Sequence, residues 1–139
     1  MSFQNPDDQA IANVLKRMRN VAVVGISLKT DRPSHGIARF LIGQGIEVYG
    51  VNPLLDEVLG IKVYPSLADI PGPIDLVDVF RRSDTVPPVV AEAIAVGAGA
   101  IWLQEGVIHE EAAAKATEAG IEVVMDRCLY KEWLRLMNG

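Results

Sequence analysis

Short apolar runs rich in β-branched residues alternate along the chain with segments of helical periodicity, and this alternation constrains the fold more than any other feature. The runs occupy residues 21–25, 47–51, 75–80, 98–103 and 121–125, with a shorter one at 62–64. Runs that are apolar at nearly every position are typical of strands buried on both faces of a parallel sheet. The order of runs and helical segments predicts a Rossmann-like α/β fold of three layers, with a mostly parallel sheet and helices on both faces.

The intervening segments carry recognisable helix ends. Asn5 and Pro6 are the expected N-cap and first-turn proline of the first helix. Ser34 is the expected N-cap of the second helix. Gly120 ends an Ala- and Glu-rich segment, as a glycine after a helix C-terminus does. A last helix is expected near residues 129–137.

The 139 residues fit a single domain, 1–139, and half of them are hydrophobic. In a parallel α/β sheet, ligands bind outside the carboxyl ends of the strands, where the strand order reverses. The loops after Gly25, Val51, Phe80, Leu103 and Met125 are therefore the expected site.

Composition and charge exclude several classes of function. The formal net charge is −5, whereas a nucleic-acid binder normally presents a basic face, so we expect no nucleic-acid partner. The polar, acidic N-terminus does not resemble a targeting segment, and no apolar run approaches the roughly 20 residues that a membrane helix needs. The single cysteine, Cys128, fits a reducing compartment. We expect a cytoplasmic protein that does not bind membranes.

The first of these loops has the features of a phosphate site. Gly25 ends the first strand and Ser27 offers a hydroxyl, and the helix that begins near Ser34 would point its N–H groups into the crevice. Basic side chains outnumber acids here, with Lys29, Arg32, His35 and Arg39 beside Asp31. This pattern predicts a phosphate or pyrophosphate ligand. The alternative is a turn glycine followed by a solvated basic face.

The second loop argues against a nicotinamide dinucleotide. In NAD-binding folds the second strand ends in Asp or Glu, which binds the ribose hydroxyl. Here it ends in Asn52 and Pro53, and the segment from Gly25 to Gly36 is not a G-x-G-x-x-G motif. Pro53 would offer a flat apolar surface to a base, although Asn-Pro also initiates turns.

Six short motifs occur in an order that resembles a known family. They are Val-Gly-Ile-Ser at 24–27, Val-Asn-Pro at 51–53 with Gly60, Tyr-Pro-Ser-Leu at 64–67, Asp-Leu-Val-Asp-Val-Phe-Arg at 75–81, Trp-Leu-Gln-Glu-Gly at 102–106 and Asp-Arg-Cys at 126–128. The chain resembles the small CoA-binding domain proteins, which are similar to the N-terminal CoA-binding domain of the succinyl-CoA synthetase α chain.

The resemblance implies a coenzyme A site and a role for each motif. Gly25 and Ser27 would meet the pyrophosphate. The composition of the first loop, and not the resemblance, adds Lys29, Arg32, Ser34 and His35 to this site. Val51, Asn52 and Pro53 would flank the adenine. Phe80 and Arg81 would line the adenosine side, and Gln104, Glu105 and Gly106 the pantetheine channel.

Catalytic chemistry has little support in the sequence. The histidine that is phosphorylated in the synthetase belongs to a further domain, and we find no nucleophile motif and no metal motif. Cys128 follows the last strand, where it would either form a disulfide with the CoA thiol or stay an inert thiol. We therefore expect a non-catalytic module that binds CoA or an acyl-CoA. The alternatives are an NAD(P)-binding protein or enzyme fragment, and a CoA-binding subunit that acts with an unknown partner ligase in trans.

Overall fold

A seven-stranded sheet forms the centre of the computed structural model, which describes residues 3–137. The strand order is β3-β4-β2-β1-β5-β6-β7. The strands are β1 (Asn20–Val24), β2 (Glu47–Val51), β3 (Glu57–Val58), β4 (Ile61–Tyr64), β5 (Leu76–Val79), β6 (Ala100–Leu103) and β7 (Glu122–Met125). All neighbouring strands are parallel except β3, which pairs antiparallel to β4.

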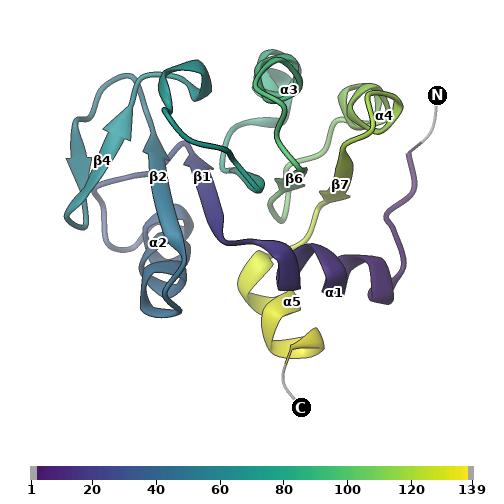
Figure 1. Cartoon of the computed structure of the whole chain (residues 1–139), viewed down its shortest axis with the longest axis horizontal. Helices are drawn as coiled ribbons and strands as arrows, with labels where there is room; N and C mark the ends of the chain where they lie inside the picture. Colours follow the sequence, from purple (N-terminus) through teal and green to yellow (C-terminus); the bar gives the residue numbers. More distant parts are fainter. Residues whose placement is uncertain (1–2, 138–139) are drawn as a thin grey trace.

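Helices cover both faces of this sheet (Figure 1). One face carries α1 (Asp8–Arg17), α2 (Pro33–Gly43) and α5 (Leu129–Leu136), and the other carries α3 (Val86–Ala95) and α4 (Glu110–Glu118). Short 3₁₀ turns lie at Leu67–Asp69 and Ser83–Thr85. The predicted three-layer, Rossmann-like α/β fold is confirmed. Within residues 3–137 no helix combines the length and the apolar character needed to cross a membrane.

The two faces of the sheet divide the core into two clusters. Alternate residues of β1 point to opposite sides, so that Val21 and Val23 pack under α1 and α2 while Ala22 and Val24 pack under α3 and α4. Trp102 of β6 is completely buried in the first cluster, and its indole N–H donates to the Arg127 carbonyl at 2.8 Å. Trp102 is therefore a core residue that also fixes the loop leading to α5.

Two expected helix starts differ in the structure. The first helix is capped by Asp7, which accepts from the Ala10 N–H at 2.9 Å, and not by Asn5. The Asn5 amide instead exchanges hydrogen bonds with both backbone groups of Met125, at 2.8 and 2.7 Å, and so occupies the edge of β7. Ser34 lies inside α2, whose N-cap is Arg32.

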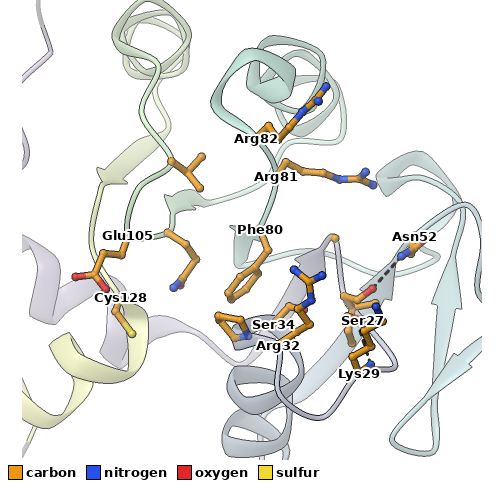
Figure 2. Close-up of a pocket in the computed structure, with 15 residues that line it drawn as sticks. Ser27, Lys29, Arg32, Ser34, Asn52, Phe80, Arg81, Arg82, Glu105 and Cys128 are labelled. Carbon is orange, nitrogen blue, oxygen red and sulfur yellow. Dashed lines mark hydrogen bonds between the residues drawn. The ribbon is translucent and has the colours of Figure 1, made fainter.

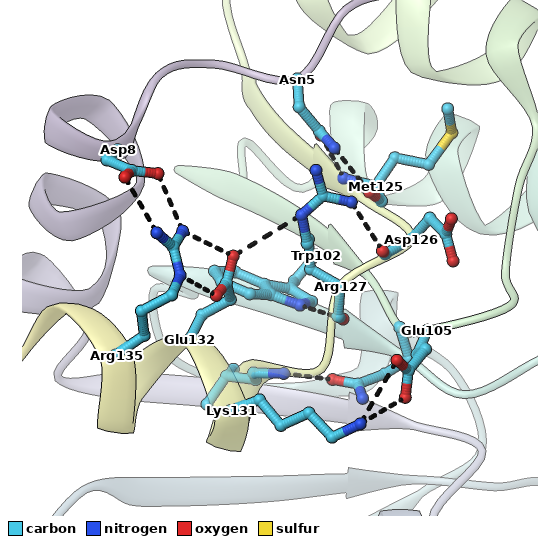
Figure 3. A network of polar contacts seen from close by, with 12 residues as sticks. Asn5, Asp8, Trp102, Glu105, Met125, Asp126, Arg127, Lys131, Glu132 and Arg135 are labelled. Carbon is cyan, nitrogen blue, oxygen red and sulfur yellow. Dashed lines mark hydrogen bonds and ion pairs between the residues drawn. The ribbon is translucent and has the colours of Figure 1, made fainter.

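A network of ion pairs joins the N-terminal segment to α5 (Figure 3). Arg135 donates two hydrogen bonds to Asp8, at 2.9 and 2.8 Å, and two to Glu132, at 2.8 and 3.1 Å. Glu132 is buried and also lies 3.6 Å from Arg127. These contacts fix α5, whose first turn borders the carboxyl ends of β6 and β7.

Candidate functional site

A cavity of about 730 Å³ lies at the carboxyl ends of the central strands. It is at the point where the chain order reverses, because β1 has β2 on one side and β5 on the other. Its walls come from the loops that follow β1, β2, β5, β6 and β7 (Figure 2). The lining residues are Gly25, Ile26, Ser27, Lys29, Arg32, Pro33, Ser34, Asn52, Phe80, Arg81, Arg82, Gln104, Glu105, Val107 and Cys128.

The floor of the cavity depends on Gly25. Its φ is +89°, and a Cβ at this position would lie 2.3 Å from the carbonyl oxygen of Phe80. Its N–H donates to the Val51 carbonyl at 2.9 Å. Glycine is needed here because β5 approaches the β1 loop so closely, a structural reason that does not involve a ligand.

Asn52 joins the loops after β1 and β2. Its amide N–H donates to the Ile26 carbonyl at 2.9 Å (Figure 2). Its side-chain oxygen accepts from the Leu54 N–H at 2.9 Å. The Ser27 hydroxyl accepts from the Lys29 N–H at 3.1 Å. Both polar side chains therefore stabilise the local backbone, which shapes one wall of the cavity.

Positive charge gathers on one side of the cavity. Lys29, Arg32, Arg81 and Arg82 line it, in a chain whose formal net charge is −5. Arg82 lies 3.4 Å from Asp84, but within residues 3–137 the other three form no ion pair. The Nε of Arg81 is buried without a hydrogen-bond partner. A buried donor of this kind is costly unless a ligand or water satisfies it.

The opposite side of the cavity is formed by β6, β7 and the start of α5. Gln104 is buried, and its oxygen accepts from the Leu129 N–H at 3.3 Å. Glu105 is exposed and pairs with Lys131 at 3.2 Å. Cys128 is half-buried at the N-cap of α5, directly beside the cavity.

The structure brings together eleven of the fifteen residues expected at the site and leaves four outside. Val51 is buried in the core, and Pro53 is exposed in the following turn. His35 is buried in α2 with its Nδ1 unpartnered. Gly106 is exposed, and its N–H donates to Asp126 at 2.8 Å. Arg39, counted in the basic cluster of the first loop, lines a separate groove.

Four lining residues escaped the sequence analysis: Ile26, Pro33, Arg82 and Val107. Arg82 could have been found, because it directly follows Arg81 at the end of a central strand. The other three are apolar, and their sequence signal does not differ from that of core residues.

The cavity has binding groups and few groups for catalysis. Its lining contains no histidine, and within residues 3–137 no lining serine or cysteine is hydrogen-bonded to a carboxylate or imidazole. No group of three or more His, Cys, Asp or Glu in this part of the chain could hold a metal ion. The arrangement suits recognition of an anionic ligand.

A parallel sheet with helices on both faces and a cavity at its switch point defines the class of Rossmann-like α/β domains. Within that class, residues 19–133 match the family described as CoA binding domain. The chain belongs to this family, as its resemblance to small CoA-binding proteins predicted.

Relatives of two kinds share this domain. An uncharacterized protein, YneT of Bacillus subtilis (strain 168), is 43% identical over 91% of this chain and 94% of its own length. The ADP-forming acetate–CoA ligase II of Archaeoglobus fulgidus is 35% identical over 66% of this chain, which corresponds to only 14% of the ligase. A hypothetical protein from Pyrococcus horikoshii OT3 has the same fold, with a TM-score of 0.92, 38% identity, and coverage of 99% of this chain and 100% of that one.

Proposed function

We propose that this protein binds coenzyme A or an acyl-CoA in the cavity at the carboxyl ends of β1, β2, β5 and β6, as a non-catalytic binding module. The pyrophosphate lies against the β1–α2 loop and the N-terminus of α2. The adenosine lies beside Phe80 and Arg81, on the side of Asn52. The pantetheine extends past Gln104 and Glu105 towards Cys128.

The observation that carries this proposal is a set of three cations around one cavity, Lys29, Arg32 and Arg81, which form no ion pair with any of residues 3–137. Coenzyme A has a pyrophosphate and a 3′-phosphate, and charge-assisted hydrogen bonds to such groups are among the strongest a protein makes. The buried Nε of Arg81 would gain an acceptor that the protein does not supply. Membership in the CoA-binding domain family supports the same ligand.

The lining also favours CoA over a nicotinamide dinucleotide. The strand tip where NAD-binding folds carry an acid is occupied by Asn52, and both polar ends of its side chain are already bonded to the backbone. On the far side the cavity forms a channel lined by Gln104, Val107 and Cys128, and by Glu105, whose carboxylate is paired with Lys131. A neutral pantetheine arm fits such a channel.

Titration calorimetry tests the proposal with CoA, 3′-dephospho-CoA and NAD as ligands. We expect CoA to bind at least about tenfold more tightly than NAD, a difference of about 1.4 kcal/mol. Loss of the 3′-phosphate should weaken binding, because it removes charge-assisted hydrogen bonds. NAD binding equal to or tighter than CoA binding would contradict the proposal.

A second candidate function is a CoA-binding subunit for a partner ligase in trans. It is favoured by the size relation, because the matched region makes up 14% of the A. fulgidus acetate–CoA ligase and 18% of the trans-feruloyl-CoA synthase FCS1. Affinity capture on the tagged chain from its native extract, with and without CoA, tests this role. Recovery of a protein that carries the remaining ligase domains would support it.

A further inference from the structure

A second hollow, of about 550 Å³, runs along the outer side of α2 up to the first turn of α5. Its apolar walls are Ile37 and Phe40 of α2 and Tyr130 of α5. We call it the α2–α5 groove. Pro33 and Cys128 line both this groove and the cavity proposed for CoA, so the two hollows meet at these residues.

Two glycines keep the groove open. Gly36 and Gly43 both lie within α2, and a Cβ built on either would meet no atom within 4 Å. Neither has a positive φ. Glycine lowers the stability of a helix relative to alanine, and neither backbone strain nor packing requires glycine at these positions. Their effect is to leave space at the helix surface.

Aromatic rings line the groove beside these glycines, because Phe40 lies four residues after Gly36 and three before Gly43 on the same face of α2. The Phe40 and Tyr130 rings meet edge to face, with centroids 4.9 Å apart and planes at 80°. Trp133 packs behind Phe40 in the same manner, at 5.6 Å. Tyr130 is 41% exposed, so part of its apolar ring is accessible from the groove. The pairing fixes the rings and leaves an apolar surface facing the groove.

We infer that the α2–α5 groove is the acyl subsite of this protein, and that it accepts an apolar acyl group of medium length carried on CoA. The inference rests on the proposed function, because that function brings the thiol end of the pantetheine to Cys128, where the groove begins. A thioester bound there extends its acyl chain away from the charged side of the cavity, along Ile37 and over Gly36 and Gly43, beside the Phe40 and Tyr130 rings. The volume lies within the range of small-molecule sites, roughly 300–1,000 Å³.

The test compares CoA, acetyl-CoA and octanoyl-CoA as ligands of the full chain by titration calorimetry. An acetyl group is too short to enter the groove, so acetyl-CoA should bind about as tightly as CoA. Octanoyl-CoA should bind at least about tenfold more tightly, because several methylenes leave water even in an open groove.

Substitutions of the glycines fill the groove without touching the CoA cavity. Gly36→Leu blocks its near end and Gly43→Leu its far end, and both replace a helical glycine by a better helix former. Each variant should lose most of the octanoyl gain, which is the tighter binding of octanoyl-CoA relative to CoA. The affinity of each variant for CoA should stay within about twofold of the parent. Ala95→Leu, at an exposed position of α3, is the matched control and should retain the gain.

The outcomes separate this inference from the proposed function. CoA binding with no octanoyl preference, or a preference that survives both glycine substitutions, overturns the acyl subsite and leaves the CoA site intact. Absence of binding by all three ligands overturns both. An octanoyl gain that Gly36→Leu and Gly43→Leu abolish and Ala95→Leu preserves supports the subsite.

Discussion

Arg32 combines two properties at the scale of a single residue. It is the N-cap of α2, so it lies where the helix exposes backbone N–H groups, and its own side chain is exposed beside the cavity. Its planar guanidinium suits phosphate oxygens better than an ammonium does. Arg39 lies less than two turns further along the same helix and is also exposed, but it does not line the cavity.

We predict that Arg32→Ala weakens CoA binding about tenfold, or about 1.4 kcal/mol, with a larger loss at low salt, where screening is least. The free energy of unfolding should change little, because the side chain is exposed. Arg39→Ala removes the same charge from the same helix and should leave CoA affinity nearly unchanged. Titration at two salt concentrations measures both effects. Equal losses for the two variants would show that overall charge matters and the position of Arg32 does not.

Asp78 has the opposite character, since it is a carboxyl group sealed inside the sheet. It is completely buried in β5, neither side-chain oxygen has a hydrogen-bond partner, and burial raises its pKa well above the usual value. From about pH 4 upward, the folded protein therefore holds a proton that the unfolded chain releases. The contribution of Asp78 to the free energy of unfolding is fully present at low pH and is lost as the pH rises towards its raised pKa.

We predict that Asp78→Asn removes this pH dependence. Its advantage over the parent should be absent near pH 4 and grow with pH, by up to about 1.4 kcal/mol per pH unit while one proton separates the two states. Urea unfolding across pH 4 to 8, as a test range of roughly four units, measures it. Asp56→Asn removes a carboxylate from the exposed surface and should show no such growth. Parallel pH profiles for Asp78→Asn and the parent would contradict the prediction.

At the scale of elements, the contact between the end of β5 and the β1–α2 loop shapes the cavity. Gly25→Ala adds a methyl group 2.3 Å from the Phe80 carbonyl oxygen and must also adopt a φ of +89°. We predict a loss of at least about 3 kcal/mol in the free energy of unfolding, together with weaker CoA binding, because both residues line the cavity.

A matched control separates backbone strain from crowding. Gly97 follows α3 with a φ of +73°, and a Cβ there would meet nothing within 4 Å. Gly97→Ala should lower the free energy of unfolding by only about 1–2 kcal/mol, the energy of a left-handed backbone at a residue with a side chain. It should leave CoA affinity unchanged. If the two variants lose the same stability in urea, the close approach of β5 has no energetic consequence.

The elements that the sequence predicts well are the strands whose residues are almost all apolar. Each buried parallel strand is apolar at nearly every position, so β1, β2, β5, β6 and β7 were found. The strand β3 has only two residues and was missed. Helix starts were less certain because several polar residues compete for the cap: Asn5 and Asp7 are both good caps, and only the position of Met125 at the edge of β7 decides between them.

The sequence predicts those site residues whose position follows from the end of a strand. Residues directly after a strand, such as Ser27, Arg81 and Gln104, line the cavity as expected. His35 lies outside the cavity lining because helical periodicity turns it into the core, one residue after Ser34, which does line the cavity. The α2–α5 groove had no sequence signal, because it depends on how two helices distant in the chain pack together.

At the scale of the whole molecule, charge is unevenly distributed. The chain has 18 acidic residues against 13 Lys and Arg, yet the cavity gathers cations on one side. Such an arrangement repels polyanions in general but focuses a local positive potential into one concave site. The proposed ligand, the compact anionic head of CoA, would meet this local positive charge.

The same distribution of groups leads to a prediction about catalysis. Acyl transfer needs a nucleophile activated by a base, and within residues 3–137 the cavity has no such pair: the Ser27 hydroxyl accepts a backbone N–H, and both histidines of the sequence lie outside the lining. We predict that the purified chain neither hydrolyses acetyl-CoA nor forms ATP from acetyl-CoA, ADP and phosphate above the buffer rate. Thiol release and ATP formation are the measurements.

A thermal-shift measurement on the same sample provides the control for that prediction. At a CoA concentration of about 100 times Kd, binding to the folded state alone stabilises it by about 2.7 kcal/mol, so the midpoint of unfolding should rise by several degrees. A sample that shows this shift is folded and binds CoA, so a lack of turnover in that sample cannot be attributed to unfolded protein. Turnover that a single substitution in the cavity lining abolishes, with Cys128→Ser as the first to try, would instead make this chain an enzyme and assign its chemistry to the loop before α5.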